Sequence, residues 1–407
     1  MTTVGVTEVR TIDPQRLGIS PWRAFEAKAE DWFDPDEIAK AKRYTTPLKR
    51  TRVVKIALST AVDLAVIRTH AMPNMLAHFG WNNWFLEVLA VVAVTTVIGV
   101  VISTPFDYWV SMVYDKKWEF STTTMRTFVS DLFKSLTIGL VLNALLISML
   151  WWIVRSTQYW WLLGWAAISL ISVGFAIVYP RVIAPLFNKF QPLQDAPLHD
   201  HILEVAHGVG ADISKVEIED TSKRDTRKNA YVAGAGKTRR MVICDTMLEW
   251  SPEEITWVSA HEIGHWRRKH IVRFIPWIVS LQLVNFVALK LVVNSHWVLR
   301  FAGVTKLGDP GAIPLFFFVF ALPSLLTDPL GNYLSRVHER EADLFGLEAV
   351  PSPESAHTAM RKLVTESLSD LTPSLWKRLT NSHPSAPERL AMIAEWERRN
   401  GATTGAS

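Results

Sequence analysis

The chain has 407 residues, of which 49% are hydrophobic, with 18 tryptophans and a formal net charge of +4. Its basic residues form no concentrated arm with interleaved aromatics, so we expect no nucleic acid partner, and the charge fits a surface beside a membrane. The single cysteine, Cys244, excludes disulfides within the chain and is expected to be a small buried hydrophobe in a strand.

Long apolar stretches predict membrane spans. A bilayer core of ~30 Å needs about 20 apolar residues to cross it, and six stretches qualify: 53–67, 84–103, 133–154, 159–183, 274–293 and 312–330. Lys55 and Asp63 interrupt the first stretch, so a buried or interfacial helix is the alternative there.

The distribution of Lys and Arg predicts the orientation. These residues are abundant in 1–52 and 184–273, whereas the connection 71–83 has none. Because cytoplasmic loops carry an excess of basic residues, both termini and the region around HEIGH are expected on the cytoplasmic side.

Changes in composition along the chain predict six consecutive regions. They are a cytoplasmic amphipathic N-terminal segment (1–50), a four-span membrane region (51–183), a soluble catalytic α+β region (184–270), a two-span hairpin (271–330), a further helix with a C-terminal catalytic segment (331–400) and a polar tail (401–407).

The soluble region mixes short strands and helices. Polar and apolar residues alternate, as they do in strands, in KVEIEDTS, KNAYVAGAG and RRMVICDTML, with a glycine-containing turn between the last two. In SPEEITWVSAHEIGHW, Ser251 supplies an N-cap and Pro252 the first helical position, and two glutamates follow at the positive end of the helix dipole. HEIGH is therefore expected inside a helix.

The HEIGH motif has the spacing of a metal site. His261 and His265 lie one helical turn apart on one face, so both imidazoles can reach one ion, and Glu262 is close enough to contact a water on that ion. A catalytic zinc needs a third protein ligand. Its role is to lower the pKa of water and to polarise a carbonyl while Glu262 takes the proton.

The third ligand is expected in SRVHEREADLFGLEAV, just after the last apolar stretch. Glu339 and Asp343 are again one turn apart, so one carboxylate can bind the metal while the other accepts the free N–H of a ligand histidine. Glu341 points elsewhere on the helix and is expected in solvent. A charged surface helix is the alternative for this stretch taken alone.

These motifs together resemble the type I CAAX prenyl protease family, integral-membrane HExxH zinc metalloproteases. The resemblance extends to YPRVIAPLFNKFQPL, SKRDTRKNAYV, VICDTMLE and NSHPSAPERL, in order and in approximate spacing. It implies an α-helical polytopic membrane protein with a zincin-like α+β cytoplasmic catalytic domain. Eukaryotic members begin with an additional span, whereas this chain is polar before Lys49, so about six spans are expected.

The resemblance also implies residue roles. His261, His265 and Glu339 would bind one Zn²⁺ per chain, with Glu262 as general base and Asp343 behind a ligand histidine. The edge strand carrying Asn229, Ala230 and Tyr231 would bind the substrate backbone.

His383 and Arg389 would stabilise the oxyanion or hold the substrate. Without the resemblance, these two residues would be a turn residue before a proline and a solvated helix charge. His338 is expected to be structural, and four neighbours of the motif are expected at the membrane interface: His270, Arg267, Arg268 and Lys269.

The leading functional hypothesis is an integral-membrane zinc endopeptidase that cleaves membrane-associated or prenylated CAAX-type C-terminal peptides, in the plasma membrane of a bacterium or the endoplasmic reticulum of a eukaryote. Its expected partners are a peptide or protein substrate and the lipid bilayer. A quality-control metalloprotease without a lipid requirement is the nearest alternative. A non-catalytic membrane scaffold is the alternative of another class, and a transporter would leave HEIGH and EREAD unexplained.

Overall fold

A computed structural model describes residue 13 and residues 16–234 and 239–404. The chain divides into two compact units, which are described separately. The first comprises Met1–Thr46, Ala176–Ile275 and Pro329–Ser407, and the second comprises Pro47–Phe175 and Pro276–Asp328.

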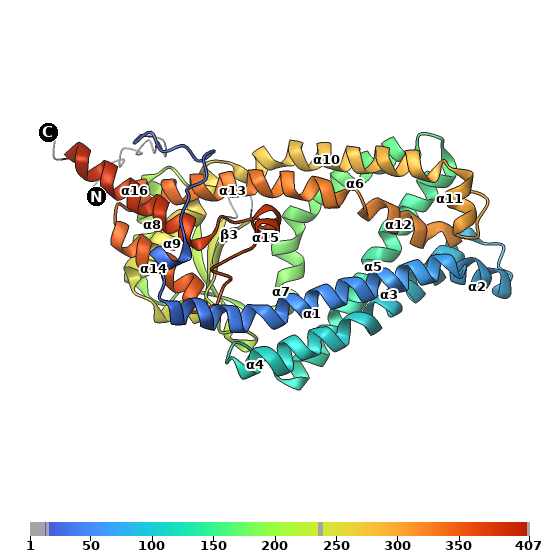
Figure 1. Cartoon of the computed structure of the whole chain (residues 1–407), viewed down its shortest axis with the longest axis horizontal. Coiled ribbons are helices and arrows are strands. Elements are labelled where there is room, and N and C mark those ends of the chain that lie inside the picture. The colour runs from blue at the N-terminus through green and yellow to red at the C-terminus, as the bar shows by residue number, and fades with distance from the viewer. Residues whose placement is uncertain (1–12, 14–15, 235–238, 405–407) are drawn as a thin grey trace, which may run out of the picture. The chain divides into compact units, whose positions relative to one another are not determined.

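The second unit is helical (Figure 1). Its core packs the fully buried Trp151, Phe286 and Phe316 among aliphatic side chains. The helices that lie in it wholly or in part are α1 (Pro35–Arg68), α2 (Ala71–Phe79), α3 (Trp84–Tyr108), the π-helical η2 (Trp109–Tyr114), α4 (Asp115–Lys117), α5 (Met125–Ser156), α6 (Trp160–Val178), α10 (His270–Val293), α11 (His296–Phe301), η7 (Pro310–Ala312), α12 (Ile313–Ala321) and α13 (Ser324–Ala349).

Several of these helices are long and apolar enough to cross a membrane. Among the described residues, length and composition alone admit three: Trp84–Lys117, Met125–Ser156 and His270–Val293. Two pairs are bent by 46°, Trp160–Ala176 with Tyr179–Phe187 and Pro310–Ala321 with Ser324–Ala349, and the number is up to five if each pair counts as one span. Exposed apolar side chains such as Val101, Leu145 and Leu291 suit lipid contact.

The observed helices differ in extent from the predicted spans. The stretch predicted as 84–103 continues through η2 and α4 to Lys117, and the one predicted as 312–330 is broken between Ala321 and Ser324. Helix α1 is not among the candidate spans, and it runs without a break across the boundary expected near residue 50. The number six therefore stays a prediction.

The first unit is built on a four-stranded sheet of order β1-β2-β4-β3. β2 (Lys215–Glu219), β3 (Ala230–Ala233) and β4 (Arg240–Cys244) are the three predicted strands, and β1 (Phe190–Pro192) is an additional one. β2 and β4 pair in parallel at the centre, and β1 and β3 pair antiparallel at the edges. The glycine-containing turn predicted after β3 includes residues 235–238, which lie outside the described residues.

Helices surround this sheet (Figure 1), and α8 (Ala196–Gly208) and α9 (Pro252–Arg267) pack against each other and against it. Their shared core includes Ile202, Met241, Trp257, Phe345 and Trp396. The remaining short and C-terminal elements are η1 (Ala29–Asp31), η3 (Tyr179–Ile183), α7 (Ala184–Phe187), η4 (Thr221–Lys223), η6 (Asp245–Glu249), α14 (Pro353–Thr365), α15 (Leu375–Thr380) and α16 (Ala386–Thr404).

The polar tail predicted for 401–407 differs in part from the structure. Residues 401–404 form the last turn of α16, and 405–407 lie outside the described residues.

Candidate active site

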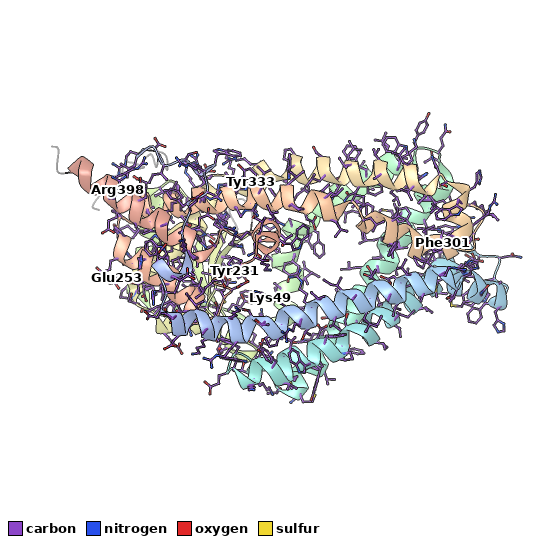
Figure 2. All side chains as sticks on the ribbon, viewed as in Figure 1. Lys49, Tyr231, Glu253, Phe301, Tyr333 and Arg398 are labelled. Atoms are coloured by element: carbon purple, nitrogen blue, oxygen red, sulfur yellow. The ribbon has the colours of Figure 1, made fainter. Side chains whose placement is uncertain are left out.

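Helix α9 presents the HEIGH motif and begins as the sequence predicts. The Ser251 hydroxyl accepts the backbone N–H of Glu254 at 3.3 Å, and the Glu254 carboxylate accepts the backbone N–H of Ser251 at 3.0 Å. Pro252 occupies the first helical position, and Glu253, labelled in Figure 2, lies in the first turn. This capping box fixes where α9 starts, and therefore which face carries His261 and His265.

Helix α13 passes close to α9 because a glycine lies between the two histidines. A Cβ atom at Gly264 would lie 3.0 Å from the Phe345 ring, which is closer than ordinary van der Waals contact. The absence of a side chain at Gly264 thus lets α13 approach the histidine-bearing face of α9.

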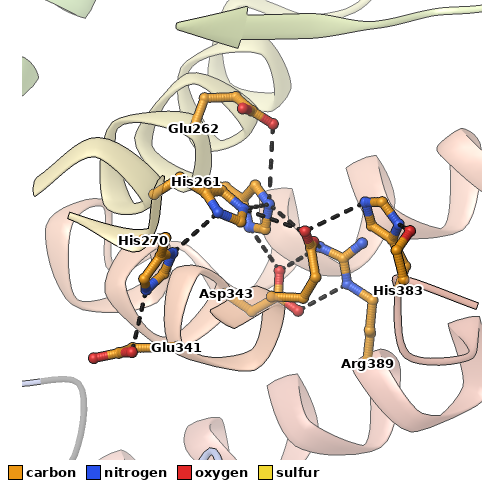
Figure 3. Close-up of polar contacts among 10 residues, drawn as sticks. His261, Glu262, His270, Glu341, Asp343, His383 and Arg389 are labelled. Atoms are coloured by element: carbon orange, nitrogen blue, oxygen red, sulfur yellow. Dashed lines mark hydrogen bonds and ion pairs between the residues drawn. The ribbon is translucent and has the colours of Figure 1, made fainter. Parts of the chain in front are cut away.

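Polar atoms of three residues converge between the two helices (Figure 3). The Nε2 atoms of His261 and His265 are 3.2 Å apart, His261 Nε2 lies 3.6 Å from Glu339 Oε2, and His265 Nε2 lies 3.5 Å from Glu339 Oε1. Tetrahedral zinc ligands at about 2.0–2.1 Å from the ion lie about 3.3–3.4 Å from one another. The three residues therefore have the spacing that one zinc ion requires.

The polar environment of these atoms also fits a cation. Glu339 is buried, and its Oε2 atom has no hydrogen-bond partner among the described residues. A buried carboxylate oxygen without a hydrogen bond is costly, and the nearest guanidinium nitrogen, Arg389 Nη2, is 4.0 Å from Oε2. The two Nε2 atoms that face each other need a proton or a metal between them. His261, His265 and Glu339 could thus hold a metal ion.

Asp343 and Arg389 lie behind His261. Nδ1 of His261 is 2.8 Å from Asp343 Oδ1. Arg389 donates two hydrogen bonds to the same carboxylate, from Nε at 2.8 Å and from Nη2 at 2.5 Å. Burial lowers the pKa of His261, but the Asp343 and Glu339 carboxylates outweigh burial and raise that pKa to about 10. For Arg389, burial also lowers the pKa, and the same two carboxylates raise it above its usual range.

Glu262 lies at the rim of the centre. Its Oε1 atom is 4.0 Å from His261 Nε2, and its side chain is 23% exposed, so water can reach the carboxylate. Burial raises the pKa of Glu262 to about 7, against the opposing effect of His261. This is the range in which a carboxylate exchanges protons near neutral pH.

His383 reaches the centre from the segment before α16. Its Nε2 atom lies 3.3 Å from Glu339 Oε1 and its Nδ1 atom 2.9 Å from Ser382 Oγ, with the side chain 61% exposed. The structure thus brings His383 and Arg389, the two residues predicted from NSHPSAPERL, to the centre. The Arg389 guanidinium is bound to Asp343, whereas the His383 ring is exposed.

The predicted substrate strand is an edge of the sheet and packs against α9. Asn229 is exposed just before β3, Ala230 is buried, and the Tyr231 hydroxyl donates to Glu219 Oε2 at 2.9 Å. Tyr231 is labelled in Figure 2. β3 therefore has one strand edge that is not used within the described sheet.

Two predictions near the centre are wrong. Glu341, expected in solvent, is 3% exposed, and His270, expected at the membrane interface, is also 3% exposed. His270 Nδ1 lies 3.0 Å from His265 Nδ1, and Arg268 Nε donates to the Glu341 carboxylate at 2.6 Å. Helix spacing could not reveal these contacts, because Lys269 turns the chain between α9 and α10 with a left-handed backbone (φ 55°).

Fold and centre together define an integral-membrane metalloprotease, and the comparisons specify its family. Residues 22–189 match the CAAX prenyl protease N-terminal family, described as having five membrane helices, and residues 192–397 match peptidase family M48. The chain belongs to the M48 peptidases of the CAAX prenyl protease type, and is a zinc metalloprotease.

Relatives come from distant organisms. A CAAX prenyl protease 1 homolog of Dictyostelium discoideum is 30% identical and covers 88% of this chain and 85% of its own. One from Arabidopsis thaliana is 30% identical, covering 77% and 74%. An uncharacterized metalloprotease of Bacillus subtilis, YhfN, is 29% identical, covering 75% and 73%.

A solved structure shares the fold. The crystal structure of S. mikatae Ste24p aligns with a TM-score of 0.81 over 93% of each chain, at 23% sequence identity. The predicted family is thereby confirmed, and so is a helical membrane protein with an M48 catalytic domain. The number of spans and the side of the membrane that the centre faces stay predictions.

Proposed function

We propose that His261, His265 and Glu339 hold the zinc ion of this protease, and that the enzyme cleaves peptide bonds near the C-terminus of CAAX-type membrane substrates. The first part rests on the convergence of three residues, whose facing histidine nitrogens and Glu339 carboxylate oxygens lie 3.2–3.6 Å apart. When bound, zinc supplies the Lewis acidity that lowers the pKa of water and polarises a peptide carbonyl.

The side chains around the ligands then have distinct roles. The partly buried Glu262 takes a proton from the attacking water and returns it to the leaving amine, for which its pKa of about 7 is suited. His383 donates its Nε2 hydrogen to the negative charge that develops on the substrate oxygen, since Ser382 Oγ can donate to its Nδ1.

Two further groups position the reacting parts. Asp343 fixes the ring of His261, and Arg389 acts through Asp343, because its two bonds to that carboxylate occupy the guanidinium. The edge strand β3, with Asn229, Ala230 and Tyr231, binds the substrate backbone as an added strand.

Relatives whose names state a substrate class support the CAAX-type substrate proposed here. The Dictyostelium and Arabidopsis proteins are named as CAAX prenyl protease 1 homologs, and the likeness to them covers both the membrane and the catalytic regions. The Bacillus relative is named only as a metalloprotease, so proteolysis without a lipid requirement is the second candidate.

One paired experiment separates these candidates. The purified protein and its Glu262→Gln variant are given a farnesylated CAAX peptide and the same peptide without the lipid. Cleavage of the lipidated peptide alone, lost in the variant, supports the proposal. Equal cleavage of both peptides supports the second candidate, and undiminished cleavage by the variant refutes the role of Glu262.

We also infer that both termini and the zinc centre face the cytoplasm, from the excess of Lys and Arg in the segments that flank the spans. With Cys244 replaced by alanine, a Lys306→Cys variant in intact cells should react with a membrane-impermeant thiol reagent, and a Lys189→Cys variant should react only after permeabilisation. The reverse pattern would show the opposite orientation.

A further inference from the structure

The two candidate histidine ligands are held from behind in different ways. Nδ1 of His261 faces a carboxylate directly, at 2.8 Å from Asp343. Nδ1 of His265 instead faces a third imidazole, with His270 Nδ1 at 3.0 Å, and the other nitrogen of His270 lies 3.1 Å from Glu341 Oε2 (Figure 3). His265 is therefore connected to a carboxylate through His270.

Only one pattern of ring protons satisfies both hydrogen bonds when the rings are neutral. The Glu341 carboxylate can only accept, so His270 carries its hydrogen on Nε2. His270 Nδ1 is then an acceptor, which requires the hydrogen of His265 to be on Nδ1. The lone pair of His265 is thereby left on Nε2, the atom that faces His261 and Glu339.

The pair behind His265 is held firmly by its surroundings. Glu341 is buried, and its carboxylate accepts from Arg268 Nε at 2.6 Å and from Arg273 Nη1 at 2.7 Å. The His270 ring stacks on His338 with centroids 4.3 Å apart and planes at 5°. Two guanidinium groups thus fix the carboxylate, and a parallel ring fixes the plane of His270.

We propose that His270 and Glu341 are positioning residues for the metal site, which hold His265 in the Nδ1-protonated tautomer and aim its Nε2 atom at the zinc. The proposal rests on the zinc site proposed above. Neither residue belongs to the candidate ligand set, and both act through His265. Loss of a group that orients a metal-bound histidine weakens metal binding by about 10–100-fold, and this range is the effect expected here.

Three substitutions in the full-length protein test the pair. His270→Phe keeps an aromatic ring against His338 and removes both hydrogen bonds, whereas in His270→Gln the amide can accept from His265 and donate to Glu341. His338→Phe is the matched control, because phenylalanine keeps a flat ring against His270 and leaves both hydrogen bonds of His270 in place.

The readout is the zinc dissociation constant, measured by competition with a chromophoric chelator, together with the visible absorption spectrum of the cobalt(II)-substituted protein. His270→Phe should bind zinc about 10–100-fold more weakly and show an altered cobalt spectrum. His270→Gln should recover most of the affinity, and His338→Phe should match the wild type. Circular dichroism and thermal unfolding of each metal-free variant report whether it folds.

Wild-type affinity and an unchanged cobalt spectrum in His270→Phe would overturn the proposal, as would equal weakening in His338→Phe. If His270→Phe fails to fold, Glu341→Leu and Glu341→Gln test the same connection. The glutamine side chain can still accept the hydrogen of His270, so the Glu341→Gln variant should bind zinc more tightly than the Glu341→Leu variant. Equal zinc affinities of the two variants would refute the positioning role. A Glu339→Gln variant that retains wild-type zinc affinity would instead refute the zinc site itself.

Discussion

Replacing Gly264 by alanine tests whether close packing of α9 on α13 sets the zinc geometry. Gly264 lies between Glu262 and His265 in HEIGH, and Phe345 follows Asp343 by two positions. A Cβ at position 264 would lie 3.0 Å from Phe345 Cδ1 and 3.1 Å from its Cβ and Cγ atoms. Since ordinary contact begins near 3.4 Å, one helix must move by about 0.4 Å, because Phe345 is fully buried.

A displacement of this size should have a large effect on zinc affinity and a modest effect on the free energy of unfolding. Ligand distances in metal sites hold to about ±0.2 Å, so a 0.4 Å separation of His265 from Glu339 should weaken zinc binding clearly. Overpacking typically lowers the free energy of unfolding by about 1–3 kcal/mol, and the higher helix propensity of alanine offsets about 0.8–1 kcal/mol of this loss. Zinc affinity should therefore fall more than the stability of the metal-free protein.

Gly208→Ala provides the control. Gly208 ends α8 in the same unit, and a Cβ there would meet no described atom within 4 Å. Zinc affinity by chelator competition and thermal unfolding of the metal-free protein are compared for both variants. The control should bind zinc as the wild type does. Wild-type zinc affinity in Gly264→Ala would refute the reasoning, since the site would then tolerate the displacement.

Three other changes have defined outcomes. Glu262→Gln should lower kcat by about 10²–10⁴-fold, while the zinc content, measured by atomic absorption, should stay unchanged. Loss of zinc in this variant would show that Glu262 is a ligand instead of a general base. Ser251→Ala should lower the free energy of unfolding by about 0.5–2 kcal/mol in denaturant titration, because the Glu254 N–H loses its acceptor; an unchanged midpoint contradicts this. Burial raises the pKa of the Cys244 thiol to about 11, so iodoacetamide at pH 8 should modify it only after unfolding.

The Cys244 shift also sets a sign for the pH dependence of stability. The unfolded thiol ionises near pH 8.5, whereas the folded one keeps its proton to about pH 11. The unfolded chain therefore binds fewer protons between these values, and the free energy of unfolding should fall as the pH rises through this window. Cys244→Ala should reduce that fall, and an identical pH profile in the variant would contradict the assignment.

Local patterns predicted the parts of the centre that a single helix determines. The one-turn spacing of His261 with His265 and of Glu339 with Asp343 placed each pair on one face, and the capping box at Ser251 fixed the start of α9. These features depend on helix geometry alone, so the sequence was sufficient.

The features that the sequence did not predict depend on how elements meet. His270 reaches His265 only because the backbone reverses at Lys269, and Glu341 is buried because α10 brings Arg273 onto it. The bend between α12 and α13 likewise divides a continuous apolar stretch that hydropathy reads as one span. Hydropathy and periodicity report one segment at a time, so they contain no information on such contacts.

Anomalous diffraction at the zinc absorption edge, from crystals of the purified protein, tests the central claim most directly. We expect one strong peak per chain between His261 Nε2, His265 Nε2 and the Glu339 carboxylate, at about 2.0–2.2 Å from each ligand atom. A peak at other residues, or zinc-dependent proteolysis by a protein whose peak leaves Glu339 uncoordinated, would contradict it.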